Sequence, residues 1–215
     1  MQLRLADREQ EVELDGRVIA ELILHLGRIA PGDGLVAGLT TGQWAILRYF
    51  TRANRFSRTP SAFAAFHGTT RGTASQAIKG LVSQGFLKQT RSETDGRSVR
   101  LDPTDKTRAI IANDPIEALV RATDALPPGV RGTLSHTLRR LLSRVAVETE
   151  KPLFGTCENC VHFQDGGCLP EGVSAHACGF LNQPLMNEEL DQLCINFASG
   201  HSGSPRTYGV GGTER

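Results

Sequence analysis

The sequence predicts a mainly α-helical protein with a small β-hairpin, arranged as a winged helix-turn-helix and followed by a cysteine-rich extension. Two observations predict this fold class. Residues 59–89 have the pattern of a short helix, a glycine-containing turn and a polar second helix, and a basic hairpin follows them. All five cysteines lie between Cys157 and Cys194, so they form a separate late segment.

The first helices follow from regularly spaced apolar residues and from recognisable end signals. Residues 17–30 place apolar side chains along one stripe, and the Pro-Gly-Asp-Gly segment after them ends this helix. The next helix begins with Thr40 or Thr41 as its N-cap and buries Trp44. A short apolar helix then starts at Pro60, because proline is favoured in the first helical turn.

The second half of the helix-turn-helix has an apolar stripe and a polar face. A Gly-Thr-Thr turn at residues 68–70 precedes it, and the stripe consists of Ala74, Ile78, Leu81 and Val82. Behind it, the pair Asp95-Gly96 indicates a tight turn between two short strands. Two further helices are expected over residues 108–126 and 130–148, separated by Pro-Pro-Gly.

Three parts of the chain are expected from these patterns. Residues 1–150 form the winged helix-turn-helix with its flanking helices, residues 151–198 form the cysteine-rich extension, and residues 199–215 form a disordered tail rich in glycine and serine. Within the last long helix, four apolar side chains recur at helical spacing. This stripe would suit a subunit interface or an intramolecular core equally well, and consists of Leu134, Leu138, Leu141 and Val145.

Positive charge is concentrated around the helix-turn-helix and favours a polyanionic partner. The whole chain has a formal net charge of only +1, but residues 46–108 carry twelve Lys or Arg against four Asp or Glu. The second helix would fit the major groove of duplex DNA, and arginines on the hairpin would suit phosphates and the minor groove. The candidate DNA contacts are Arg71, Thr73, Ser75, Gln76 and Lys79 on the helix and Arg91, Arg97 and Arg100 on the hairpin.

These segments resemble the multiple-antibiotic-resistance-regulator (MarR) family of transcriptional regulators. The resemblance covers about residues 17–147 and is carried by LTTGQWAILRYF, GTTRGTASQAIKGLVSQGFLKQT and DGRSVRLDPTDKTR, although Asp102-Pro103 departs from the family's pattern at the end of the wing. It implies a homodimer with dimer helices at both ends of the domain, which reads a palindromic DNA site. It also implies that Asp95 orients Arg97 for the minor groove, whereas Asp95 by itself indicates only a turn.

The cysteine spacing C-x2-C-x7-C-x9-C-x15-C favours a metal centre. The start of the sequence has no secretory pattern and no stretch long and apolar enough for a membrane, so a cytoplasmic location is expected. Thiols stay reduced there, which disfavours disulfides. The expected ligands are Cys157, Cys160, Cys178 and Cys194, with Cys168 as a spare or exchanging ligand and with His162 and His176 outside the ligand set.

Two kinds of metal centre are compatible with these four cysteines. An iron–sulfur cluster, 4Fe-4S or 2Fe-2S, is favoured because the chain has a single C-x2-C pair, widely spaced remaining cysteines and a phenylalanine soon after three of them. A structural zinc ion with four cysteine ligands is the alternative. A cluster directly behind the last dimer helix would tune DNA binding by sensing redox state, iron or oxygen.

Two other functions compete with this one, namely a regulator of a different kind and an enzyme. The second regulator would have a structural zinc and would respond to a small organic ligand in a cleft lined by Trp44, Phe50, His25 and Arg48. An enzyme is not expected, because the sequence contains no glycine-rich phosphate loop and no nucleotide fingerprint. Ser135 and His136 are adjacent, so on a helix their side chains point in different directions.

Overall fold

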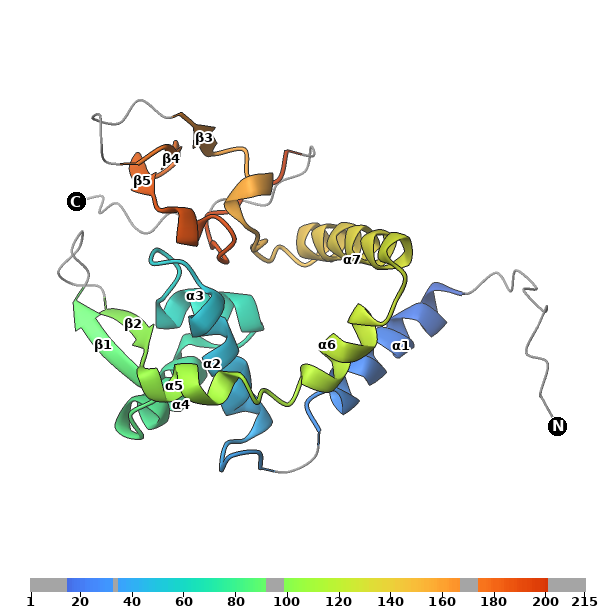
Figure 1. Ribbon diagram of the computed structural model, residues 1–215, viewed down its shortest axis with the longest axis horizontal. Coiled ribbons are helices and arrows are strands. Elements are labelled where there is room, and N and C mark those ends of the chain that lie inside the picture. The colour runs from blue at the N-terminus through green and yellow to red at the C-terminus, as the bar shows by residue number, and fades with distance from the viewer. Residues whose placement is uncertain (1–14, 33–34, 92–98, 167–173, 201–215) are drawn as a thin grey trace.

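The computed structural model describes residues 15–32, 35–91, 99–166 and 174–200 (Figure 1). The first part contains α1 (Gly16–Ile29), α2 (Thr41–Arg52), α3 (Pro60–His67), α4 (Arg71–Ser83), β1 (Leu87–Arg91), β2 (Val99–Pro103), α5 (Asp105–Ile111), α6 (Glu117–Asp124) and α7 (Pro128–Glu148). The second contains the 3-10 turn η1 (Cys157–Asn159), the strands β3 (Phe163–Asp165), β4 (His176–Cys178) and β5 (Gln183–Leu185), and the turn η2 (Asn187–Glu189). The predicted mainly helical fold with a winged helix-turn-helix is confirmed.

Local end signals set the helix-turn-helix. The Thr59 side chain accepts a hydrogen bond from the backbone nitrogen of Ala62 at 3.1 Å, and Pro60 occupies the first turn of α3. Helix α3 ends at Gly68, whose φ of 66° lies in the left-handed region that glycine adopts without strain. The Thr70 side chain then caps α4, so three residues separate the two helices.

The wing is the antiparallel pair β1–β2. Leu87 lies opposite Pro103 and Arg91 lies opposite Val99, so all five residues of each strand are paired. The strands continue directly from α4, and Leu87 and Leu101 enter the main core beside Trp44. The predicted hairpin is therefore present, while its expected turn at Asp95-Gly96 lies outside the described residues.

The segment expected to form one helix over residues 108–126 forms two. Helix α5 ends at Ile111, and α6 begins only at Glu117. Pro115 disfavours a helical conformation at the residue before it. The carboxylate of that residue, Asp114, accepts one hydrogen bond from Arg48 at 2.7 Å and another from the backbone nitrogen of Ile116 at 3.0 Å, which fixes the break.

Helices α1 and α7 expose apolar stripes to solvent in the single chain. No residue of α1 is buried, and in α7 only Ala146 is buried. On α1, Leu22 is 55% exposed and Leu26 is 47% exposed. The leucine stripe of α7 is also exposed, so in the single chain it does not serve as an intramolecular core. Large exposed apolar faces of this kind mark interaction surfaces.

The cysteine-bearing segment packs against the winged helix. Figure 1 shows the part that carries β3, β4 and β5 beside α2 and α3, with α7 leading to it from α6. Strand β4 is the central strand of this antiparallel sheet. Ile195 is buried in the main core, and Phe154 packs against the same core. No helix in the described ranges combines the length and the apolar character that a membrane span requires.

Candidate nucleic-acid interface and cysteine site

Helix α4 presents a polar face to solvent. Its apolar residues Ala74, Ile78 and Leu81 are buried, which fixes the rotation of the helix. Of the candidate DNA contacts on this helix, Ser75 is half-buried and four are exposed, namely Arg71, Thr73, Gln76 and Lys79. The Thr73 hydroxyl also lies 2.9 Å from that of Thr70 within the N-cap. The exposed set could reach base edges or phosphates, as the second helix of a helix-turn-helix does.

Only some of the residues predicted to contact DNA from the wing lie within the described structure. Arg91 ends β1, and Asp95 and Arg97 lie outside the described residues. Arg100 is half-buried on β2, and its Nε donates a hydrogen bond to the Oδ2 atom of Asp102 at 3.1 Å. Its guanidinium is therefore held to the wing by one nitrogen and is less free than a solvated side chain.

Asp102 joins three other side chains at the base of the wing. Its Oδ1 accepts a hydrogen bond from Arg58 at 3.0 Å, and its Oδ2 accepts one from Thr90 at 3.0 Å as well as that from Arg100. Burial alone would raise the pKa of this carboxyl, but the hydrogen bonds and the arginine charges outweigh burial and lower the pKa. Asp102 therefore stays ionised and locks both strands of the wing to Arg58.

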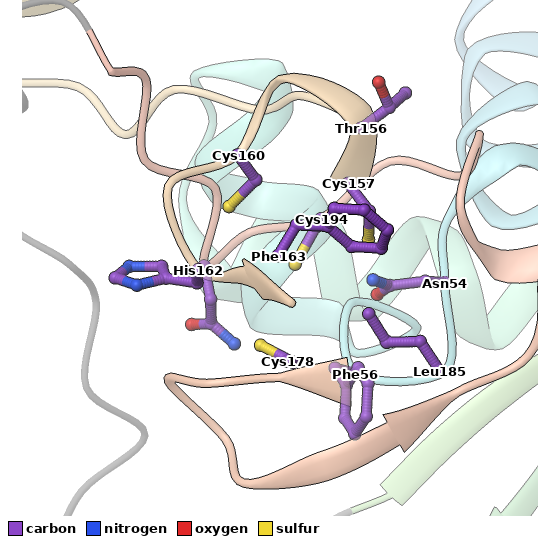
Figure 2. Close-up of a pocket in the computed structure, with 11 residues that line it drawn as sticks. Asn54, Phe56, Thr156, Cys157, Cys160, His162, Phe163, Cys178, Leu185 and Cys194 are labelled. Carbon is purple, nitrogen blue, oxygen red and sulfur yellow. The ribbon is translucent and has the colours of Figure 1, made fainter. Parts of the chain in front are cut away.

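The cysteine site is a hollow that four thiols share. Cys157, Cys160, Cys178 and Cys194 all line it, and all four are free thiols (Figure 2). They come from η1, the end of η1, β4 and the segment after η2, so the fold brings together cysteines up to 37 residues apart. The free volume within the hollow is about 10 Å³, which is room for about one water molecule. Cys168, the fifth cysteine, lies outside the described residues.

The four thiols influence one another electrostatically. The pKa of Cys157 is raised to about 12, mainly by burial and in addition by the neighbouring Cys194, Cys160 and Cys178. Burial also raises the pKa of Cys194, and the polar groups of Asn54 and Asn196 beside it only partly offset this rise. The ionised forms of Cys157 and Cys194 are therefore disfavoured unless a cation neutralises them, and a bound metal would do this.

The donor set fits a thiolate-ligated metal, although the side chains are not in place for an ion. Among the described residues, no three His, Cys, Asp or Glu side chains are arranged to hold a metal ion. Binding would therefore require the cysteine side chains to adjust around the hollow. Four soft sulfur donors suit both zinc and an iron–sulfur cluster, so the chemistry of the donors alone does not choose between them.

The hollow is also lined by residues other than the four cysteines. Asn54 and Phe56 come from the turn between α2 and α3, so the winged helix supplies one wall. His162 and Asn196 also line the hollow, and the His162 Nε2 and Asn196 Oδ1 atoms are buried without a hydrogen-bond partner in the described structure. His162 was expected near the cysteines but outside the ligand set, whereas no local signal indicates Asn54, which reaches the site only through tertiary packing.

The side chains expected around a small-ligand cleft are dispersed. Trp44 and Phe50 are buried in the core, and the Trp44 indole nitrogen donates a hydrogen bond to the carbonyl of Val36 at 3.0 Å. Arg48 is paired with Asp114, and His25 is exposed on α1. These four residues therefore do not form one cleft in this chain.

Comparison with known proteins agrees with this fold. Residues 37–98 match the sequence model of the MarR family. CouR from Rhodococcus jostii RHA1 bound to p-coumaroyl-CoA is similar with a TM-score of 0.50 and 19% identity, over 61% of this chain and 94% of that chain. A MarR transcriptional regulator from Methanosarcina mazei Go1 has a TM-score of 0.46 and 21% identity, over 60% of this chain and 96% of that chain.

The S. aureus MepR–DNA complex is similar with a TM-score of 0.47 and 14% identity, over 62% of this chain and 99% of that chain. No curated protein sequence matches the chain. The family match includes α2, α3, α4 and β1, so it covers the helix-turn-helix and the first strand of the wing but ends before β2. Residues 37–98 of this chain are therefore similar in sequence to the MarR family.

Proposed function

We propose that this protein is a sequence-specific DNA-binding transcriptional regulator that acts as a homodimer. The exposed polar face of α4, placed beside a basic wing in a MarR family domain, is the observation that supports this proposal most. The exposed apolar stripes of α1 and α7 support the dimer, because pairing with a second copy would bury them. Two recognition helices would then read two half-sites about one helical turn, roughly 34 Å, apart.

We further propose that a cysteine-ligated iron–sulfur cluster tunes DNA binding. The four free thiols that line one hollow support a shared inorganic centre. Phe56, Phe163 and Leu185 form part of its wall and would limit the access of water. Gain, loss or oxidation of the cluster would change the structure of the extension, and the winged helix that packs against it would respond.

The alternative keeps the regulator but replaces the cluster with a structural zinc ion and makes a small organic ligand the signal. CouR with its bound p-coumaroyl-CoA is an example of a ligand complex on this fold. In this chain the side chains expected to line such a cleft are in the core or apart from one another. The cysteine hollow therefore favours the inorganic centre as the signal-receiving site.

Metal analysis and an absorption spectrum under argon test the centre. The expected result is a brown protein with a visible charge-transfer band and with iron and sulfide in stoichiometric amounts. A serine variant at Cys157, Cys160, Cys178 or Cys194 should lose the centre, whereas Cys168→Ser should retain it as the matched control. A colourless protein with one zinc per chain would reject the cluster and support the alternative.

Binding to the DNA upstream of the protein's own coding sequence tests the regulator. Specific binding should fall steeply with salt, and Lys79→Ala should weaken it and reduce the slope of log K against log salt by about one. Arg140→Ala on α7 removes the same charge away from α4 and should leave the slope unchanged. Equal affinity for this DNA and for random duplex would contradict a sequence-specific regulator.

A further inference from the structure

The winged helix, and not the extension alone, holds the fourth cysteine in place. The backbone nitrogen of Leu193 donates to the carbonyl of Arg52 at 2.8 Å, and the Asn54 nitrogen donates to the Leu193 carbonyl at 3.0 Å. On the other side of Cys194, the Ile195 nitrogen donates to the Ser57 hydroxyl at 2.9 Å. Cys194 is therefore positioned by a short ladder of hydrogen bonds to the turn between α2 and α3.

Asn54 connects this ladder to the cysteine hollow. The residue is 1% exposed, and its Oδ1 accepts hydrogen bonds from the Ser57 nitrogen at 3.1 Å and the Ser57 hydroxyl at 2.7 Å. Its Nδ2 is buried and has no hydrogen-bond partner among the described residues, and the Asn54 side chain lines the same hollow as Cys194 (Figure 2). A change at Cys194 would thus act directly on the Asn54–Ser57 pair.

The residue that follows this pair holds the wing. The carbonyl of Arg58 accepts a hydrogen bond from the Leu101 nitrogen at 2.8 Å, and its guanidinium pairs with Asp102 at 3.0 Å. The Arg58 Nε donates a hydrogen bond to the carbonyl of Ala53 at 2.9 Å, which links the two ends of the turn. Asp102 then reaches β1 through Thr90, so both strands of the wing are connected to the turn that contacts Cys194.

We propose that the turn formed by residues 54–58 couples the cysteine centre to the wing, so that filling the centre fixes the wing and raises the affinity for DNA. This inference rests on the proposed function. A filled centre ties the Cys194 sulfur to the other three cysteines and so immobilises the ladder at Leu193 and Ile195. An empty centre frees Cys194, loosens the turn and lets the wing sample orientations that do not match the groove, which lowers the affinity.

The test compares the DNA affinity of the full-length protein loaded with iron and sulfide with that of the chelated, reduced protein. The DNA is a duplex selected from a random pool by the loaded wild type. The wild type should bind about 5- to 150-fold more tightly when loaded, the usual range for coupled sites. Ser57→Ala removes the contact to the cysteine segment, and Asp102→Asn removes the contact to the wing. In each variant, the ratio of the affinity of the loaded protein to that of the chelated protein should fall to within about twofold of one.

A matched control and a second measurement complete the test. Asp105→Asn removes the carboxylate of an exposed Arg–Asp pair close to the wing and should keep the wild-type ratio. In the wild type, loading should slow hydrogen exchange at the Leu101 amide, a measurement that needs no variant to fold. If loading does not change the wild-type affinity, the proposed tuning fails. If loading does change the wild-type affinity, two results would contradict the coupling through residues 54–58 while leaving the proposed tuning intact. One is an Asp102→Asn variant that keeps the full affinity ratio at an unchanged metal content, and the other is a Leu101 amide whose exchange is unaffected by loading.

Discussion

Asp102 is the residue on which the wing depends, and its ionisation predicts a pH effect. Asp102→Asn at neutral pH should lower the free energy of unfolding by about 3 kcal/mol, because it leaves the partly buried charge of Arg58 without its partner. The folded-state pKa lies below the ordinary value of 3.8, so this contribution is present above about pH 4 and is lost as the pH falls through the folded-state pKa.

Urea denaturation of the wild type and Asp102→Asn at pH 7 and at pH 3 would check this prediction. The difference between the two proteins should be large at pH 7 and should shrink at pH 3. Asp105→Asn, on the exposed pair with Arg108, should behave like the wild type at both pH values. A difference that stays constant with pH would mean that the Asp102 carboxylate is not what stabilises the wing.

Cys157 should be unreactive in the folded, metal-free protein. The thiolate is the form that an alkylating reagent attacks, and burial beside three other cysteines raises the pKa of Cys157 to about 12. At pH 8.5, iodoacetamide should modify Cys157 at least about 100-fold more slowly in the folded protein than in the urea-unfolded protein. Peptide mass spectrometry gives both rates, and similar rates would show that the thiols are not gathered as described.

Individual residue positions could be predicted from the sequence where neighbouring residues along the chain determine them. The polar positions of α4 were predicted because Ala74, Ile78 and Leu81 define its buried side, which leaves the opposite side to solvent. Asn54 could not be predicted, because its role depends on Leu193 and Ile195, more than a hundred positions away along the chain. Periodicity and spacing carry no information about such a contact.

At the level of elements, capping residues explain what could be predicted. Thr40, Thr59 and Thr70 each precede a helix and accept a hydrogen bond at its start, and Gly68 ends α3. The break between α5 and α6 was missed because the apolar spacing continues across it. Its signal was Pro115, which restricts the residue before it and so favours a helix end at this place.

Gly155 controls how the loop before η1 fits against the end of the cysteine segment. A Cβ atom at this position would lie 2.6 Å from the Phe197 ring, and the Gly155 carbonyl accepts a hydrogen bond from the Cys194 nitrogen at 2.9 Å. Gly155→Ala should therefore force the ring or the loop to shift, at a cost of about 1–3 kcal/mol, and should reduce the retention of metal.

Gly179→Ala is the matched control for this substitution. Its Cβ would mainly meet the amide nitrogen at the far end of the flexible Gln164 side chain, which can move aside. Urea denaturation and metal content should therefore change much less than for Gly155→Ala. Equal effects of the two variants would indicate that the fit between Gly155 and Phe197 is not required.

For the whole molecule, the place where the cysteine-rich extension contacts the winged helix could not be predicted from the sequence. The extension was expected behind the last dimer helix, and its docking on the turn between α2 and α3 came only with the structure. Arg55 of that turn pairs with Glu189 and also donates to the carbonyl of Pro184. Residues 1–150 carry 21 Lys or Arg against 16 Asp or Glu, and residues 151–215 carry 3 against 7, which is compatible with this contact. Charge alone, however, does not determine where one part binds the other.

The exposed stripes of α1 and α7 predict that the stable form is a dimer. Leu134, Leu138 and Leu141 on α7 are 36–40% exposed in the single chain, and a second copy would remove them from water. Leu138→Lys would place a charge within this apolar surface, so light scattering after size exclusion should show a monomer, and DNA affinity should fall because one half-site is lost. His136→Lys adds the same charge on the other side of the helix and should remain dimeric. A wild type that is monomeric at micromolar concentration, or a dimeric Leu138→Lys variant, would contradict an interface through this stripe.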